Sequence, residues 1–142
     1  MLYKNYRHCT DIQVRFNDID SLKHVNNACY LSYCEIGRVN YFHAIFRNHI
    51  NWIDRGFVLA RTEMDHLNPI FLQDKVKCYT RIEKIGTKSI TVSNCIVKEN
   101  KSEIIECANA LGILVAMDYK KELSIDVPKE WVALIKTFEI EL

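Results

Sequence analysis

The sequence predicts an α+β domain in which one antiparallel sheet wraps one long helix. Three observations predict it. Helical apolar spacing extends from residue 28 to about 46 without a proline, and strict two-residue alternation covers 75–85. Polar turns at 86–88 and 100–102 then join three strands into an antiparallel meander. The order of strand, long helix and four antiparallel strands is an α+β pattern.

The first predicted strand and the long helix adjoin a polar stretch. Apolar and polar residues alternate over 12–17, the period of a half-buried strand. Asn26 and Asn27 precede the helical pattern, where an N-cap is expected. The helix, 28–46, is apolar on most sides, so we expect other structure to wrap it. Gly37 inside it indicates a close contact with the sheet.

The remaining elements are predicted from the alternation of apolar and polar residues and from the proline and turn residues between them. A strand is predicted from Phe57 to about Asp65, and Asn68-Pro69 ends its pairing. Strands at 75–85, 89–98 and 103–117 form the meander. Pro128 stands at a first helical position and begins a short helix. The apolar face of that helix carries Trp131, Leu134, Ile135 and Phe138.

Composition limits the class of protein. The 142 residues are 49% hydrophobic, enough for the core of one domain spanning 1–142. The formal net charge of +1 argues against a nucleic-acid partner. The chain has no apolar run of the roughly 18 residues needed to span a membrane, and its start lacks the apolar region of a signal peptide. We therefore expect a cytoplasmic protein without integral membrane association.

The six cysteines predict buried, reduced thiols. They are scattered singly without a CxxC pair, so neither a disulfide scaffold nor a structural zinc site is expected. No feature marks one thiol as activated. The cysteines are Cys9, Cys29, Cys34, Cys78, Cys95 and Cys107.

The chemistry converges on the stretch between the first strand and the helix. Asp20 and His24 lie between a strand end and a helix start. That location supplies uncovered backbone N–H groups and the positive end of a helix dipole. Both stabilise negative charge that develops on a substrate oxygen.

The same stretch, FNDIDSLKHVNNACYLSYCEIGR from Phe16 to Arg38, resembles the signature of the hotdog-fold acyl-CoA thioesterases, the 4-hydroxybenzoyl-CoA thioesterase-like family. The Asn68-Pro69-Ile70 break, Asp74 and the 86–89 turn extend the resemblance over nearly the whole chain. It implies the hotdog fold and a homodimer whose two sheets join edge to edge, or a homotetramer. The substrate it implies is an acyl-CoA or an acyl carrier protein thioester, hydrolysed without metal or organic cofactor.

The resemblance also implies roles in the reaction. Asp20 is the general base or the nucleophile, and the backbone N–H of Asn27 polarises the thioester carbonyl. His24 orients the water or hydrogen-bonds that carbonyl. From the residues alone, the interpretation of Asp20 as a turn cap is at least as well supported as a catalytic role. The motif favours the catalytic role. Asp18 is expected to brace the loop.

Further residues are expected around this site. One of Asn26 and Asn27 caps the helix while the other shapes the pocket, and Tyr30 forms pocket wall. Candidate cations for the CoA phosphates are Arg61, Lys84 and Lys88.

Glu35 is the alternative catalytic carboxylate, because other hotdog branches place theirs on this helix. We favour instead a buried ion pair between Glu35 and Arg38.

Two other functions stay open on the same scaffold. One is a hydratase or dehydratase of acyl thioesters, and the other is a non-catalytic acyl-thioester-binding module. The Asp-x-Asp run followed by His-Val-Asn-Asn favours hydrolysis. Lys23 stands where the family commonly has glycine, so either the turn before His24 is reshaped or a charge is placed beside the pocket.

Overall fold

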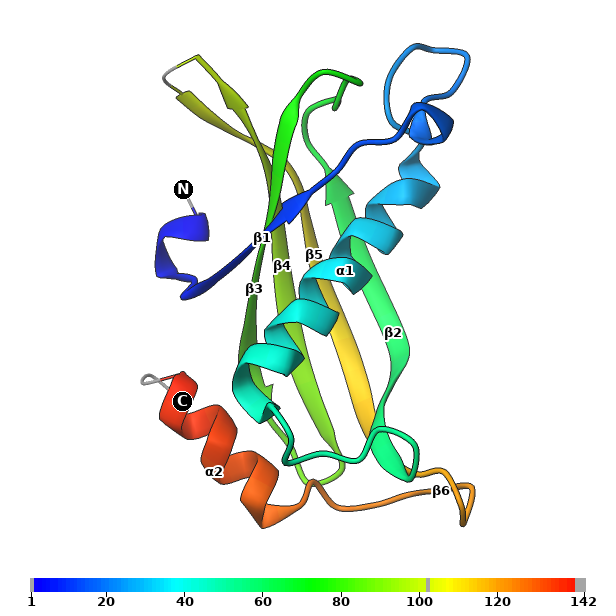
Figure 1. Ribbon diagram of the computed structural model, residues 1–142, viewed down its shortest axis with the longest axis vertical. Helices are drawn as coiled ribbons and strands as arrows, with labels where there is room; N and C mark the ends of the chain where they lie inside the picture. Colours follow the sequence, from blue (N-terminus) through cyan, green and yellow to red (C-terminus); the bar gives the residue numbers. More distant parts are fainter. Residues whose placement is uncertain (1, 102, 140–142) are drawn as a thin grey trace.

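A long helix, α1 (Asn27–Phe46), crosses one face of a curved antiparallel sheet (Figure 1). The computed structural model describes residues 2–101 and 103–139. The sheet has the order β1-β3-β4-β5-β2, and the short β6 pairs with β5. Its strands are β1 (His8–Ile12), β2 (Arg55–His66), β3 (Lys75–Ile85), β4 (Ser89–Asn100), β5 (Glu103–Asp118) and β6 (Leu123–Ser124). This arrangement confirms the predicted α+β hotdog architecture.

Most element boundaries agree with the periodicity of the sequence. The long helix begins one residue before the predicted start, and β3 has its predicted bounds, Lys75–Ile85. The C-terminal helix α2 (Lys129–Phe138) begins directly after Pro128. The predicted turn at 100–102 includes Ser102, which lies outside the described residues.

The first strand was predicted in the wrong place. The paired segment is β1, and its last residue, Ile12, pairs with Val76 of β3. Phe16–Asp18 is a 3-10 helix, η2, instead of a strand, and Phe16 is 80% exposed. The reason is local. The Asp18 carboxylate accepts a hydrogen bond from the Arg15 backbone N–H at 2.9 Å, which bends the chain away from extended geometry.

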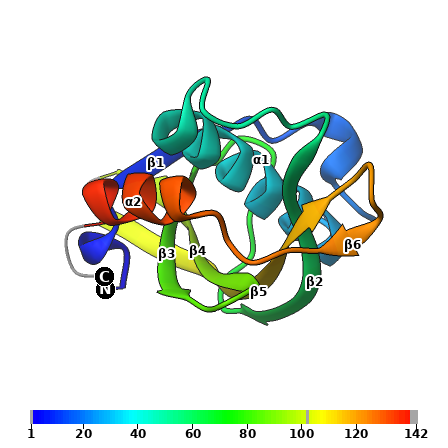
Figure 2. The same cartoon turned by 90° about the horizontal axis from the view of Figure 1, so that it is seen from below.

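The C-terminal end of α1 is closed by aromatic packing. Seen from below, the sheet curls under α1, with α2 lying beside it (Figure 2). Phe46 is fully buried there, and the rings of Phe57 and Trp131 lie 5.1 Å apart. Trp131 lies on α2, so the C-terminal helix contributes directly to the core that α1 and the sheet share.

Gly37 holds α1 close to the sheet, as predicted. A Cβ atom there would lie 2.6 Å from Cys78 Sγ and 2.9 Å from Thr80 Oγ1 on β3. All six cysteines are free; four are buried, Cys29 is partly buried, and only Cys9 is exposed. The expectation of buried reduced thiols therefore holds for most of them.

The other flank of α1 is uncovered within one chain. The helix packs against β1, β3 and β4. Leu31, Ile36 and Val39 stay exposed on it, although the sequence predicted a helix wrapped on most sides. Val58 and Leu59 are likewise exposed on β2, an edge strand of the sheet. None of the described helices is long and apolar enough to cross a membrane.

Candidate active site

A tight polar turn precedes α1 and sets the geometry of the site. Ile19 and Val25 form an isolated antiparallel bridge across it. Inside the bridge, the Asp20 N–H donates to the His24 carbonyl at 3.1 Å, so the two predicted catalytic residues are backbone partners. Lys23 has a φ of 66°, the left-handed conformation that glycine adopts most easily. The turn keeps the shape that a glycine would favour, with a charged side chain added to it.

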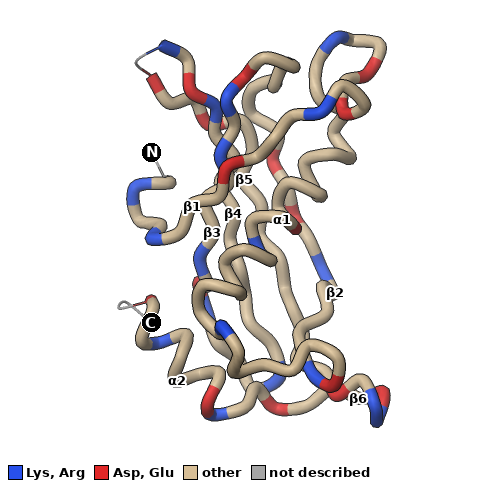
Figure 3. Tube along the Cα trace, viewed as in Figure 1, with Lys and Arg blue, Asp and Glu red and all other residues tan. Residues whose placement is uncertain are grey.

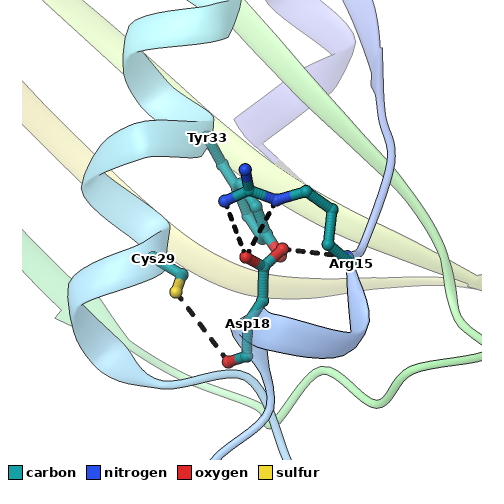
Figure 4. A network of polar contacts seen from close by, with 4 residues as sticks. All are labelled: Arg15, Asp18, Cys29 and Tyr33. Carbon is teal, nitrogen blue, oxygen red and sulfur yellow. Dashed lines mark hydrogen bonds and ion pairs between the residues drawn. The ribbon is translucent and has the colours of Figure 1, made fainter.

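Asp18 braces this turn, as predicted, and is 1% exposed (Figure 4). Its carboxylate accepts hydrogen bonds from the Arg15 guanidinium at 2.8 Å and from the Tyr33 hydroxyl at 2.7 Å. Burial by itself would raise the pKa of Asp18, but these hydrogen bonds outweigh it and hold the pKa below its ordinary value. Burial and the bond to Asp18 raise the pKa of Tyr33. Asp18 is therefore saturated with donors.

Asp20, two residues later, is in a different state. It is partly buried, and its Oδ1 accepts one hydrogen bond, from the Leu22 N–H at 2.8 Å. No ion pair to it is recorded among the residues that the structure describes. One carboxylate oxygen is thus fixed by the turn while the other has no such tether.

The start of α1 leaves one donor unused. The Asn26 side chain caps the helix by accepting from the Ala28 N–H at 2.9 Å, and the Asn26 carbonyl accepts from Cys29 at 2.9 Å. The Asn27 N–H has no acceptor among the described residues. Of the two asparagines, Asn26 therefore caps the helix and Asn27 carries the free donor.

Asn27 lines a pocket of about 210 Å³. Its helix side is formed by His24, Asn27 and Tyr30. Its other side is the end of β2 and the residues after it, His66 to Pro69. Tyr30 is buried, which raises its pKa to about 12, so its hydroxyl stays protonated at neutral pH. Tyr30 is pocket wall, as expected.

Sequence reasoning missed the β2 side of this pocket. His66 packs edge-on against Tyr30, with ring centroids 4.7 Å apart and an interplanar angle of 84°. The sequence marked 68–69 only as the end of a strand. The Asn68-Pro69 break did indicate that a strand ends here, beside some other element. Only the folded sheet shows that this element is the start of α1.

The predicted phosphate-binding cations do not join this pocket. Arg61 is exposed on β2 and pairs with Glu63. Lys84 and Lys88 are exposed near the β3–β4 turn. That turn is at the far end of β3 from Val76, the partner of the last residue of β1, a separation of roughly 30 Å along the strand. Figure 3 shows basic and acidic positions interspersed over the molecule.

The expected ion pair between Glu35 and Arg38 is wrong. Arg38 is 8% exposed, whereas Glu35 is exposed, and no ion pair joins them. The helix turns Arg38 toward the sheet along with Gly37, while Glu35 faces outward beside Ile36. Glu35 does not line the pocket either. Among the residues described, no group of three or more histidine, cysteine, aspartate or glutamate side chains is placed to hold a metal ion.

Comparison with known proteins identifies the family. The sequence profile of the thioesterase-like superfamily matches residues 14–135. The chain is 26% identical over 124 residues to the long-chain acyl-CoA thioesterase FadM of Escherichia coli (strain K12), covering 85% of this chain and 91% of that protein. It is 33% identical over 116 residues to the chloroplastic acyl-acyl carrier protein thioesterase ATL3 of Arabidopsis thaliana, covering 80% of this chain and 60% of that protein.

A solved structure agrees with these relatives. A thioesterase from Thermus thermophilus, crystallised with coenzyme A and Zn, superposes with a TM-score of 0.83. It is 31% identical, and the match covers 96% of each chain. With a family profile that spans most of the chain and a fold that agrees with it, this protein belongs to the thioesterase-like superfamily and is a hotdog-fold thioester hydrolase.

Proposed function

We propose that this enzyme hydrolyses acyl-CoA or acyl carrier protein thioesters, and that it does so in the pocket at the start of α1. The observation that carries this proposal is the unused N–H of Asn27, a residue that lines a pocket together with His24, beside the turn that holds Asp20. The names of FadM and ATL3 support the two carrier classes. The family supports hydrolysis over the hydration of acyl thioesters.

In the proposed reaction, the thioester carbonyl oxygen accepts a hydrogen bond from the Asn27 N–H. This donor and the positive end of the helix dipole stabilise the negative charge that develops on that oxygen. Asp20 either takes a proton from a water that attacks the acyl carbon or attacks that carbon itself. The carbon–sulfur bond then breaks, and the thiolate leaves and takes up the proton released by the water. When Asp20 is the nucleophile, this step leaves an acyl–Asp20 anhydride, which a water hydrolyses to the free acid. The turn tethers one Asp20 oxygen through Leu22, which orients the carboxylate for this step.

His24 is proposed to hold the attacking water or the carbonyl. Its Nδ1 lies 3.4 Å from the Val25 carbonyl, at the long end of the hydrogen-bond range. Nε2 is the ring nitrogen that we propose meets the substrate. Asn26 acts indirectly, since its cap fixes the start of the helix and so the direction of the Asn27 N–H.

We also propose that the enzyme is a homodimer joined along β2, or a homotetramer made of two such dimers. The apolar side chains of Leu31, Ile36 and Val39 on α1 and of Val58 and Leu59 on the edge strand β2 support it, because exposed edges of this kind are normally covered. A second copy offers the same edge, so antiparallel pairing of the two β2 strands is self-complementary.

In such an assembly, we propose that the cations that lie outside the pocket of their own chain bind the CoA phosphates of a substrate held by the partner chain. Arg61, Lys84 and Lys88 are exposed, and their guanidinium and ammonium groups are of the kind that binds phosphate. Their substitution by alanine is then expected to raise KM for acyl-CoA without lowering kcat, because a uniformly lost binding contact acts on KM alone.

The function is tested by thiol release from short, long and aromatic acyl-CoAs and from an acyl carrier protein thioester. Free thiol that accumulates with any of them supports the proposal, and the preferred chain then names the acyl group. Loss of enoyl absorbance without thiol release would identify a hydratase. Thioester binding without turnover would instead indicate a binding module.

A further inference from the structure

His66 stands opposite the start of α1, and neither the motif nor the family resemblance assigns it a role. It is the last residue of β2 and pairs across the sheet with Ala108 of β5. The pocket brings it together with Asn27, which lies 39 positions earlier in the sequence. Strand β2 and helix α1 therefore each supply one wall of the same small space.

The ring of His66 is positioned by protein while its nitrogens stay unused. It meets Tyr30 edge to face at 4.7 Å, a geometry favoured by aromatic pairs. Tyr30 is 3% exposed and sits one helical turn after Asn27, so it is a fixed surface for the histidine. The His66 side chain is exposed, and within residues 2–101 and 103–139 neither of its ring nitrogens has a hydrogen-bond partner, so both are open to solvent or to a ligand. A polar ring is thus held in place at the pocket without a protein acceptor.

The size of the pocket limits what these nitrogens can meet. Its volume is about 210 Å³, and Asn27 and His66 both line it. A ligand group bound against the Asn27 N–H therefore also lies near the His66 ring.

Imidazole suits a donor role in either charge state. The neutral ring carries one N–H and the charged ring carries two, so a donor is present in both. The start of α1 offers the carbonyl one free backbone donor, and stabilisation of an oxyanion commonly uses more than one.

We propose that His66 is a catalytic residue that donates the second hydrogen bond to the thioester carbonyl oxygen, across the pocket from the Asn27 N–H. No proton needs to transfer for this role. As the oxygen gains negative charge in the tetrahedral intermediate, the hydrogen bond strengthens, and it relaxes when the carbon–sulfur bond breaks. Tyr30 holds the imidazole at the correct side of the pocket. This inference rests on the proposed site at the start of α1.

Substitution of the ring without loss of its shape tests the inference. His66→Phe keeps an aromatic ring against Tyr30 and removes only the N–H. We expect kcat for acyl-CoA hydrolysis to fall about 10²–10³-fold with KM little changed, the usual effect of losing one oxyanion donor. His66→Gln supplies an amide N–H and is expected to recover at least tenfold over His66→Phe. His43→Phe, at an exposed histidine near the other end of α1, is the matched control and should leave kcat unchanged.

The outcomes separate this inference from the proposed function. If wild type hydrolyses the thioester and Asp20→Asn abolishes turnover while His66→Phe keeps kcat within threefold, the function stands and the His66 role is wrong. Equal activity of His66→Phe and His66→Gln would also overturn it, because a donor should matter. Wild type that turns over no thioester overturns both. Chemical denaturation of each variant shows whether any loss of kcat comes from unfolding.

Discussion

The two ends of α1 are built from different materials. At the Phe46 end, aromatic rings from α1, β2 and α2 pack against one another, and Trp131 is 2% exposed. At the Asn27 end, the helix meets a polar turn, a free N–H and a pocket with two histidines. The cluster at the Phe46 end is rich in aromatic rings. At the Asn27 end, the Asn27 N–H has no acceptor among the described residues. Each end has its own buried apolar cluster, and the Asn27 end adds the polar turn and the pocket where the proposed chemistry takes place.

Two aspartates repeat this contrast within three residues. Asp18 is buried and accepts from Arg15 and Tyr33, so its negative charge is already stabilised by protein. Asp20 is tethered through a single oxygen. A carboxylate surrounded by donors is a weak base, whereas one with an unoccupied oxygen is available to water or substrate. This difference is the physical reason to separate a bracing residue from a reacting one in the Asp-x-Asp pair.

Removing the central ring of the closed end should give the largest loss of stability. Trp131→Ala is expected to lower the free energy of unfolding by about 3–5 kcal/mol, the usual range for deleting a buried aromatic side chain. Denaturant unfolding measures it. Ile53→Ala, at an 84% exposed residue near the same end, is the control and should change little. Equal effects of the two would show that the aromatic packing does not hold this end together.

Asp18→Asn should break the brace of the turn at the Asn27 end of α1. We expect it to lower the free energy of unfolding by about 3 kcal/mol, because a buried partner of a charged hydrogen bond is lost. The pH dependence checks the mechanism. The folded pKa of Asp18 lies below that of the unfolded chain, about 3.9. Its contribution is therefore full above that pH and disappears as pH falls through the lower folded pKa.

Unfolding measured between about pH 6 and pH 2 should show this acid-dependent loss in wild type and less of it in Asp18→Asn. An identical pH profile in the two proteins would contradict the assignment.

The helix cap should give the smallest effect. Asn26→Ala removes the acceptor for the Ala28 N–H and is expected to cost about 1 kcal/mol, while Asn26→Asp retains an acceptor and should cost less. The midpoint of urea unfolding measures both. If the two variants were equally destabilised, the side-chain cap would not be what stabilises the start of α1.

Periodicity and turn chemistry predicted most of the fold. The alternation over 75–85 predicted the observed bounds of β3. The motif contains His24, Asn27 and Tyr30, which line one pocket in the structure. These features depend on residues close in sequence. The single-domain boundary and the cytoplasmic location stay predictions.

What the sequence missed depends on distant contacts. His66 joins the pocket only because β2 ends beside α1 in the folded sheet. Alternation over 12–17 looked like a strand, but hydrogen bonds between Arg15 and Asp18 turned that segment into η2. The spacing of Glu35 and Arg38 suggested an ion pair, but the sheet covers one face of α1, and Arg38 is on that face while Glu35 is not.

The most direct test compares Asp20→Asn with Asp18→Asn in thiol-release kinetics and denaturant unfolding on the same preparations. Asparagine keeps the oxygen that accepts from Leu22, so Asp20→Asn should leave the free energy of unfolding within about 0.5 kcal/mol of wild type. Its kcat should fall by about 10²–10⁴-fold. Asp18→Asn should lose stability and keep most turnover in its folded fraction. If Asp20→Asn retains full turnover, or if folded Asp18→Asn is the variant that loses it, the division between bracing and reacting aspartates is wrong.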